Sequence, residues 1–331
     1  MVVKFLLVIG VLFVLQLFPE GIYAQESYSR TLLLMGNRFD ITVVADNQER
    51  GGKAIDLAIG EIQRIEKLIS SWDPNSQTSN INRNSGIAPV KVDPELFGLI
   101  KRALAISKLT DGAFDITYAS MDRIWTFDGS MTQMPSSEEI TSSVSKVGYQ
   151  QIVLNEEDFK VYLPVKGMKI GFGAIGKGYA ADKAKQLLIS NGIKGGIINA
   201  SGDMNTWGSQ ENGKPWTVGI INPMNKEKVF ATVPVKGAVV TSGNYEKQVI
   251  FDGVRYSHII NPKTGYPATG LISVTVFTSQ AELADALATA VFVMGAEVGL
   301  DRINQIPGTE CIIVTDKGGL LTSNNINLDL K

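Results

Sequence analysis

Apolar residues recur along most of the chain with the spacing of strands or of helices. Alternation over residues 29–44, on either side of a turn at 35–38, predicts a β-hairpin. Residues 52–69 place apolar side chains every three or four positions and predict an amphipathic helix. A second helix is predicted at 94–109, because Asp93 can cap it and a proline suits its first turn.

Polar segments separate these elements from the next ones. Residues 75–86 are rich in turn formers, and we interpret them as an ordered surface loop. Residues 113–115 are predicted to enter an extended segment, and Trp125 with the polar stretch 129–141 predicts an exposed flap. The remaining short elements are predicted to be a helix or turn at 136–146 and strands at 152–154 and 161–163.

Apolar residues alternate over residues 161–170 and predict a strand. Three glycines, Gly173, Gly176 and Gly178, follow it, and the apolar pattern then resumes as a predicted helix. Such a junction leaves amide hydrogens free at the helix N-terminus, with Lys177 beside them and few side chains to exclude a ligand. These features suit a phosphate or pyrophosphate group. Tight packing between strand and helix is the alternative interpretation, because the spacing matches neither GxGxxG nor GxxxxGK[ST].

The second half of the chain repeats a pattern of strand followed by polar turn. Strands are predicted to run into such turns at 199–203 and at 239–245, and two further strands are predicted at 216–221 and 229–235. Strands and helices mix without the regular alternation of a doubly wound parallel sheet, which indicates an α+β fold. No repeat or linker divides the chain.

The apolar face of a helix over residues 283–292 places Asp285 and Thr289 together on the adjoining face, one turn apart. A carboxylate and a hydroxyl are hard oxygen ligands that suit magnesium, with water and substrate phosphates completing the coordination. A structural hydrogen bond between the two side chains is the alternative interpretation.

The first 24 residues have the order of a secretory signal peptide: one lysine, an apolar run, and the small residue Ala24 before the expected cleavage site. A retained membrane anchor is the alternative. No cysteine follows the run, so we do not expect lipidation. In either case residues 25–331 are expected to form one domain outside the cytoplasm.

Composition narrows the chemistry further. A net charge of −2 favours neither nucleic acid nor an anionic membrane as partner. Cys311 is the only cysteine, which excludes an intramolecular disulfide and a thiolate metal cluster, and we expect it to pack in a buried strand. His258 is the only histidine, so a resident metal should be bound by oxygen ligands.

His258 precedes an Asn-Pro-x-Thr-Gly turn at residues 261–265 instead of lying in a regular apolar run. A histidine in such a place can face a cleft and take a proton from a hydroxyl nucleophile. A structural hydrogen-bonding role is the alternative.

The motifs GAIGKGYAAD, TSGNY, SHIINPKTG and ADALATAVFVMG, in this order after an upstream DGAFD, together resemble the ApbE family of FAD:protein FMN transferases. The resemblance spans the chain from about Leu32 to about Leu321. It implies one compact domain of mixed, largely antiparallel sheets with packed helices. It also implies a protein that is exported or attached to the membrane, in the periplasm or on the outer face of the inner membrane.

The resemblance further implies an activity. Such an enzyme binds FAD and magnesium and transfers the FMN moiety, through a phosphoester bond, to a serine or threonine hydroxyl of an acceptor protein. AMP is released. The acceptor would be a subunit of a redox complex or an exported flavoprotein.

Site residues follow from the same resemblance. The backbone oxygen of Ala174 would bind magnesium together with Asp285 and Thr289, and His258 would activate the acceptor hydroxyl. Gly171 stands where many relatives have an aspartate, which removes one expected polar contact to the nucleotide. The FAD contacts would be Met35, Trp72, Ala113, Phe114, Asp115, Gly171, Lys177 and Ile260.

Two other functions remain open. An FAD pyrophosphatase, which forms FMN and AMP, would use the same residues, with water in place of the protein hydroxyl. An exported FAD-binding protein without catalysis is less favoured, because a carrier needs neither a pair of metal ligands such as Asp285 and Thr289 nor a general base such as His258. The products formed with and without an acceptor protein distinguish the three.

Overall fold

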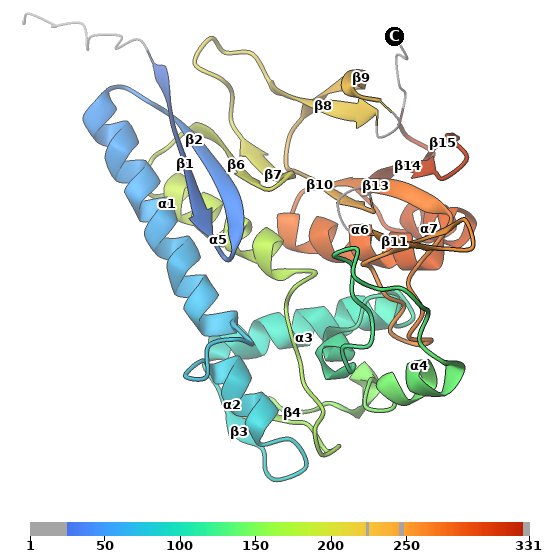
Figure 1. The fold of residues 1–331 in the computed structure, drawn as a ribbon. Coiled ribbons are helices and arrows are strands. Elements are labelled where there is room, and N and C mark those ends of the chain that lie inside the picture. Colours follow the sequence, from blue (N-terminus) through green and yellow to red (C-terminus); the bar gives the residue numbers. More distant parts are fainter. Residues whose placement is uncertain (1–24, 223–224, 245–247, 327–331) are drawn as a thin grey trace, which may run out of the picture.

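One eight-stranded antiparallel sheet organises the fold (Figure 1). A computed structural model describes residues 25–222, 225–244 and 248–326 of the chain. Every strand pairing in this sheet is antiparallel. The strands lie in the order β1 (Glu26–Leu34), β2 (Asn37–Ala45), β6 (Gly195–Ala200), β7 (Asp203–Trp207), β10 (Ala238–Gly243), β13 (Leu271–Thr278), β14 (Glu310–Thr315) and β15 (Leu320–Thr322).

Helices cover one face of this sheet, and a hairpin lies over part of the other. The helices α1 (Gln48–Ile69), α5 (Gly176–Ser190) and α6 (Ala281–Met294) pack side by side, and α7 (Ala296–Asn304) contacts β14. The hairpin of β8 (Trp216–Asn222) and β9 (Asn225–Val235) joins a small second cluster that includes Val218, Val235, Val239 and Ile312.

Residues 70–175 form the lower part of the molecule in Figure 1, between α1 and α5 in the chain. Their apolar side chains belong to the same hydrophobic core as those of the sheet and its helices, so the prediction of one α+β domain is confirmed. The elements are α2 (Gln77–Arg83), β3 (Val90–Lys91), α3 (Pro94–Leu109), the 3₁₀ helix η1 (Ile116–Ser120), α4 (Ser137–Ser143), η2 (Tyr149–Gln151), β4 (Val153–Asn155) and β5 (Lys160–Tyr162). A further hairpin, β11 (Gln248–Phe251) and β12 (Val254–Ser257), completes the described elements.

Elements predicted from local signals agree closely with the structure. The Asp93 carboxylate accepts a hydrogen bond from the Glu95 amide at 2.7 Å, as expected for the cap of α3. The first long helix begins at Gln48, four residues before the predicted start, because the Asn47 side chain caps it by accepting the Arg50 amide at 2.9 Å. Cys311 is buried in β14, as predicted.

The sequence predicted a loop at residues 75–86, but this polar stretch contains α2. The Ser76 hydroxyl caps this helix by accepting the Ser79 amide at 2.9 Å. Ile81 is fully buried on the face that packs toward the core. A single apolar residue in a polar stretch shows no helical periodicity, so the sequence pattern could not indicate this helix and the prediction of a loop was wrong.

Two further predictions in this part are corrected. Asp115 has an extended backbone, but the chain after it turns into η1, because the Asp115 carboxylate accepts the Thr117 amide at 2.7 Å. Trp125 is buried and is not part of an exposed flap, because its indole nitrogen donates to the Gly265 carbonyl oxygen at 2.9 Å.

The segment before the glycines is also different from the prediction. The strand β5 ends at Tyr162, and residues 163–175 reach α5 without regular structure. Their backbone groups bond to other segments, as when the Gly171 amide donates to the Ile116 carbonyl at 2.9 Å and the Ile170 amide to the Asn82 side chain at 2.8 Å. Such long-range partners leave no trace in the local pattern.

None of the described helices is both long and apolar enough to span a lipid bilayer. The predicted signal peptide, residues 1–24, lies outside the described residues.

Candidate functional site

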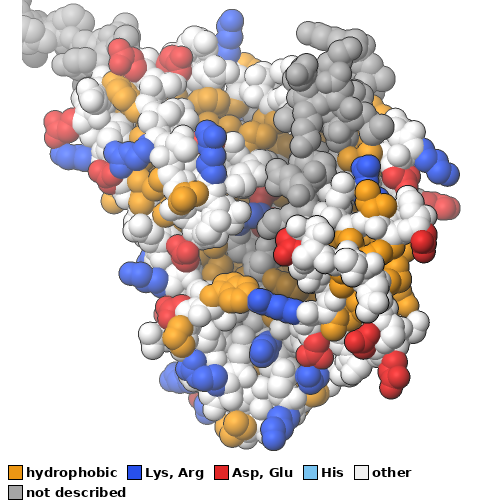
Figure 2. Space-filling view, viewed as in Figure 1, with side chains coloured by type: hydrophobic (Ala, Val, Ile, Leu, Met, Phe, Trp, Pro, Cys, Tyr) orange, Lys and Arg blue, Asp and Glu red, His pale blue; other side chains and the backbone are white. Residues whose placement is uncertain are grey.

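A cleft of about 890 Å³ lies between the lower part of the molecule and the layers of sheet and helices. Its volume is in the range of sites that hold a drug-sized or cofactor-sized molecule. Figure 2 shows the molecule hollowed near the middle of one face, with basic and apolar side chains at the edge of the hollow. Segments near residues 71, 115, 125, 173, 203, 242, 260 and 287 all contribute to the lining.

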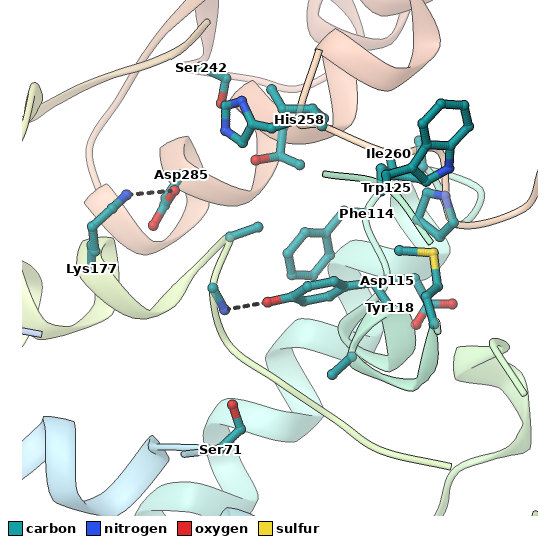
Figure 3. A pocket seen from close by; sticks show the side chains of 18 of the residues that line it. Ser71, Phe114, Asp115, Tyr118, Trp125, Lys177, Ser242, His258, Ile260 and Asp285 are labelled. Carbon is teal, nitrogen blue, oxygen red and sulfur yellow. Dashed lines mark hydrogen bonds and ion pairs between the residues drawn. The ribbon is translucent and has the colours of Figure 1, made fainter. Parts of the chain in front are cut away.

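The predicted site residues gather in this cleft, with two exceptions. Those that line it are Trp72, Ala113, Phe114, Asp115, Ala174, Lys177, His258, Ile260, Asp285 and Thr289. Figure 3 shows that many of them point into one shared space. The structure thus brings together residues separated by more than 200 positions in sequence, while their individual roles stay predictions.

Met35 and Gly171 do not line the cleft. Met35 lies in the turn between β1 and β2 with a positive φ of 51°, and its methyl group lies near Gly176. Gly171 packs against η1, where a Cβ atom would come within 3.0 Å of the Ala119 Cβ. An aspartate at this position would therefore require Ala119 to move, which accounts for a glycine here in terms of packing.

One end of the cleft carries a cluster of three charges: Lys177 on α5, Asp203 on β7 and Asp285 on α6. The Lys177 ammonium donates to Asp203 and lies 3.7 Å from Oδ1 of Asp285. Burial lowers the pKa of Lys177, but the charges of Asp285 and Asp203 outweigh burial and hold that pKa above its ordinary value. Burial raises the pKa of Asp203, although the Lys177 ammonium opposes the rise. Lys177 is therefore a fixed positive charge inside the cleft.

The set Ala174, Asp285 and Thr289 meets in the cleft and fits magnesium in its donor chemistry. Oδ2 of Asp285 accepts the Gly178 amide at 3.2 Å, which orients the carboxylate. The described residues hold no cluster of three or more Asp, Glu, His or Cys side chains that could bind a metal, and the predicted set has only one carboxylate. Such a site would need substrate or water oxygens to complete it.

The position of Asp285 depends on how α6 begins. Asp182, buried on α5, accepts the amides of Ala281 at 3.1 Å and Glu282 at 2.8 Å. Asp182, on a neighbouring helix, therefore accepts hydrogen bonds from backbone amides that have no partner within the first turn of α6. Gln280, the N-cap residue, makes no side-chain hydrogen bond to them. This contact fixes α6, and with it Asp285, relative to α5 and Lys177.

Gly178 permits the same close approach of α5 and α6. A Cβ atom at this position would lie 2.1 Å from the Ala281 carbonyl oxygen, which is backbone and cannot rotate away. Gly178→Ala is therefore expected to destabilise the protein by about 3 kcal/mol, the upper end of overpacking costs, as measured by urea denaturation.

Gly60→Ala is the matched control. Gly60 is an exposed glycine within α1, and a Cβ there meets no atom within 4 Å. Because alanine is the better helix former, this change should stabilise the protein by about 0.5–1 kcal/mol. Equal effects of the two substitutions would contradict the close packing of α5 on α6.

The segment that carries His258 is held in place by the lower part of the molecule. Besides its bond to Gly265, Trp125 stacks on Tyr256 of β12 with ring centroids 6.2 Å apart. The Lys263 ammonium donates to the Asp111 carboxylate at 2.8 Å. His258, which immediately follows β12, is exposed and points into the cleft, toward the space that Ser242 and Asp285 also face (Figure 3).

The opposite end of the cleft is more apolar. Trp72 is 76% exposed, and the Arg123 guanidinium lies 4.6 Å from its ring centroid, in a cation–π contact. Phe114 and Ile260 line the same space. Asp115 bonds to Thr117 and, through its other oxygen, to the Tyr149 amide at 3.0 Å, while burial raises its pKa. Both oxygens of the Asp115 carboxylate therefore accept hydrogen bonds from neighbouring groups of the protein.

Several lining residues were not singled out by the sequence. Tyr118 accepts the Gly173 amide at 3.1 Å (Figure 3), and desolvation raises the pKa of its phenol. Arg123 and Ser71 also line the cleft. Their segments show no recognisable motif. Asp203 was noted, but only as a turn former, because its pairing with Lys177 joins residues 26 positions apart.

Comparison with known proteins shows what this chain is similar to. A model of the ApbE family matches residues 35–313. The FAD:protein FMN transferase of Treponema pallidum (strain Nichols) is 31% identical over 309 residues, which cover 87% of this chain and 84% of that protein.

Solved structures show the same similarity. The ApbE protein of Thermotoga maritima MSB8 is 34% identical, with a TM-score of 0.82 over 90% of this chain and 97% of that one. The apo form of the flavinyl transferase ApbE from Pseudomonas stutzeri is 25% identical, with a TM-score of 0.80 over 91% and 95% of the two chains.

Proposed function

The chain belongs to the ApbE family, and we propose that it is a magnesium-dependent FAD:protein FMN transferase. It attaches FMN to a serine or threonine of an acceptor redox protein and releases AMP. The observation that carries the proposal is the extent of the family match: residues 35–313 contain every residue that lines the cleft. Fold similarity alone would not support an activity, but here the matched range includes the site itself.

The two ends of the cleft suit the two parts of FAD. Lys177, which stays charged, offers a partner for pyrophosphate oxygens. Phe114, Ile260 and the exposed face of Trp72 offer apolar and aromatic surface for a planar ring system. We assign the pyrophosphate to the charged end and a ring of the substrate to the apolar end.

Ala174, Asp285 and Thr289 would hold the metal ion. When bound there, magnesium would neutralise charge on the pyrophosphate and make AMP a better leaving group. The Gly178 amide keeps the Asp285 carboxylate in one orientation, so that a ligand oxygen is already in place.

His258 accepts the proton of the acceptor hydroxyl as the hydroxyl oxygen forms a bond to the phosphorus of the FMN half. The bond from that phosphorus to the oxygen of the AMP phosphate breaks, and AMP departs with the electron pair. Phosphoryl transfer depends mainly on position and charge stabilisation, which a fixed lysine and an oriented carboxylate supply.

We further propose that the enzyme acts outside the cytoplasm, in the periplasm or at the outer face of the inner membrane. The arrangement of charge and apolar residues in positions 1–24 supports export. A retained segment would attach the enzyme to the membrane next to membrane-bound acceptors.

The experiment is to incubate the full-length protein with FAD, magnesium and candidate acceptor subunits, and to measure acceptor mass and released AMP. A mass gain of one FMN with matching AMP is expected. AMP and free FMN without a modified acceptor, across a panel of redox-complex subunits, would favour the pyrophosphatase. Tight FAD binding with neither product would favour a carrier.

A further inference from the structure

Asp203 is a buried carboxylate that the proposed reaction does not use. It is the first residue of β7, is 3% exposed, and lines the charged end of the cleft. Its carboxylate accepts the Lys177 ammonium and a hydrogen bond from the Thr241 backbone. Burying a carboxylate is costly unless it is paired and hydrogen-bonded, as Asp203 is by Lys177.

Lys177 has two carboxylates within reach, on different elements. It donates a direct hydrogen bond to Asp203, whereas its distance of 3.7 Å from Asp285 is too long for a hydrogen bond. Asp285 itself is held from its other oxygen by the Gly178 amide. Lys177 therefore forms an ion pair with both carboxylates, but its direct hydrogen bond goes to Asp203, so Oδ1 of Asp285 accepts no hydrogen bond from the ammonium (Figure 3).

We propose that Asp203 is a positioning residue: it takes the direct hydrogen bond of the Lys177 ammonium, limits the contact of that ammonium with Asp285 to the longer ion pair, and so leaves the Asp285 carboxylate available to a divalent cation. The inference rests on the proposed function, because it assigns a metal to Asp285. Asp203 touches neither the predicted metal nor, by this assignment, the reacting phosphorus, and acts through Lys177.

The charges of the cluster give the expected direction. With Asp203 present, the positive charge of Lys177 is shared between two carboxylates, those of Asp203 and Asp285. Without the charge of Asp203, the ammonium has only Asp285 as an anionic partner, and a cation must then displace it. Partners that act through a neighbouring group typically change metal affinity 10- to 100-fold, and we expect a loss of that size.

The test measures Mn²⁺ binding to the full-length protein without FAD, from the electron paramagnetic resonance signal of free Mn²⁺. Asp203→Asn should weaken binding 10- to 100-fold. Lys177→Met should bind at least as tightly as the wild type. The double variant Asp203→Asn/Lys177→Met should recover wild-type affinity to within about threefold, because the competing ammonium is gone.

A purely structural role of Asp203 predicts a different pattern, since the double variant would then bind as weakly as Asp203→Asn. That result, or wild-type affinity in Asp203→Asn, would overturn the inference. Absence of Mn²⁺ binding in the wild type would overturn it as well. If Asp203→Asn does not fold, as judged by thermal unfolding, Lys177→Met alone decides, because weakened binding in that variant contradicts competition by the ammonium.

Asp158→Asn is the matched control. Asp158 also pairs with a lysine, Lys160 at 2.7 Å, but it is on the surface and does not line the cleft. It removes one negative charge without touching the cluster, and Mn²⁺ affinity should not change. The inference and the proposed function can fail separately. The expected pattern of Mn²⁺ affinities can hold in a protein that transfers no FMN, and FMN transfer can occur in a protein whose Mn²⁺ affinity does not change when Asp203 is substituted.

Discussion

Asp285→Ala is expected to abolish magnesium-dependent FMN transfer, with a fall in kcat of at least about 10³-fold, because the only carboxylate of the predicted metal site is removed. The loss should not be recovered at high magnesium concentration. The measurement is the rate of acceptor mass gain and of AMP release across a magnesium titration.

Two variants separate this effect from misfolding. Asp285→Asn keeps an oxygen to accept the Gly178 amide but removes the charge, so the protein should fold and still be inactive. Asp301→Ala removes an exposed carboxylate of α7 that does not line the cleft, and this variant should transfer FMN at the wild-type rate. Full activity of Asp285→Ala would remove the proposed metal role.

His258→Ala is expected to lower transfer to the acceptor protein by about 10²- to 10⁴-fold, the usual contribution of a general base. FAD binding should change little, because the imidazole is assigned to the acceptor hydroxyl and not to the nucleotide. Acceptor mass over time, with FAD affinity measured by fluorescence titration, gives both quantities.

His258 is exposed at the cleft, so free imidazole can reach its place in the alanine variant. Partial recovery of transfer by imidazole in the buffer would support a base at this position. Arg255→Ala, an exposed change on β12 three residues earlier, is the control and should leave the rate unchanged. Unchanged flavinylation by His258→Ala would eliminate the assignment of the base.

The predictions that were confirmed depend on neighbours in sequence. The cap of α3 is one example, since Asp93 and the Glu95 amide are two residues apart. The hairpin of β1 and β2 is another, because its strands adjoin a two-residue turn and pair from Glu26 with Ala45 to Leu34 with Asn37. In such elements the partner of each group lies within a few positions, so the pattern of side chains is sufficient.

The predictions that were wrong concern segments whose partners are distant. Trp125 is buried because its indole meets Gly265, 140 positions later. Residues 163–175 lack the predicted strand because their backbone bonds to η1 and α2. Polarity and turn propensity indicate that burying a segment is costly. They do not show whether a distant segment supplies hydrogen-bond partners for its polar groups.

For the site, the sequence by itself determined which chemical groups are available. One histidine, no pair of cysteines, and a carboxylate and hydroxyl one helical turn apart restrict the chemistry to oxygen ligands and a single imidazole. The i, i+4 spacing of Asp285 and Thr289 follows from helix geometry alone.

Tertiary structure alone decided how these groups act together. Asp182 on α5 accepts a backbone amide of the first turn of α6, and Gly178 lets the two helices approach. Asp203 accepts a hydrogen bond from the Lys177 ammonium beside Asp285. Each contact joins elements far apart in the chain. Its energy depends on burial and on distances between charges, which exist only after the sheet and helices have packed.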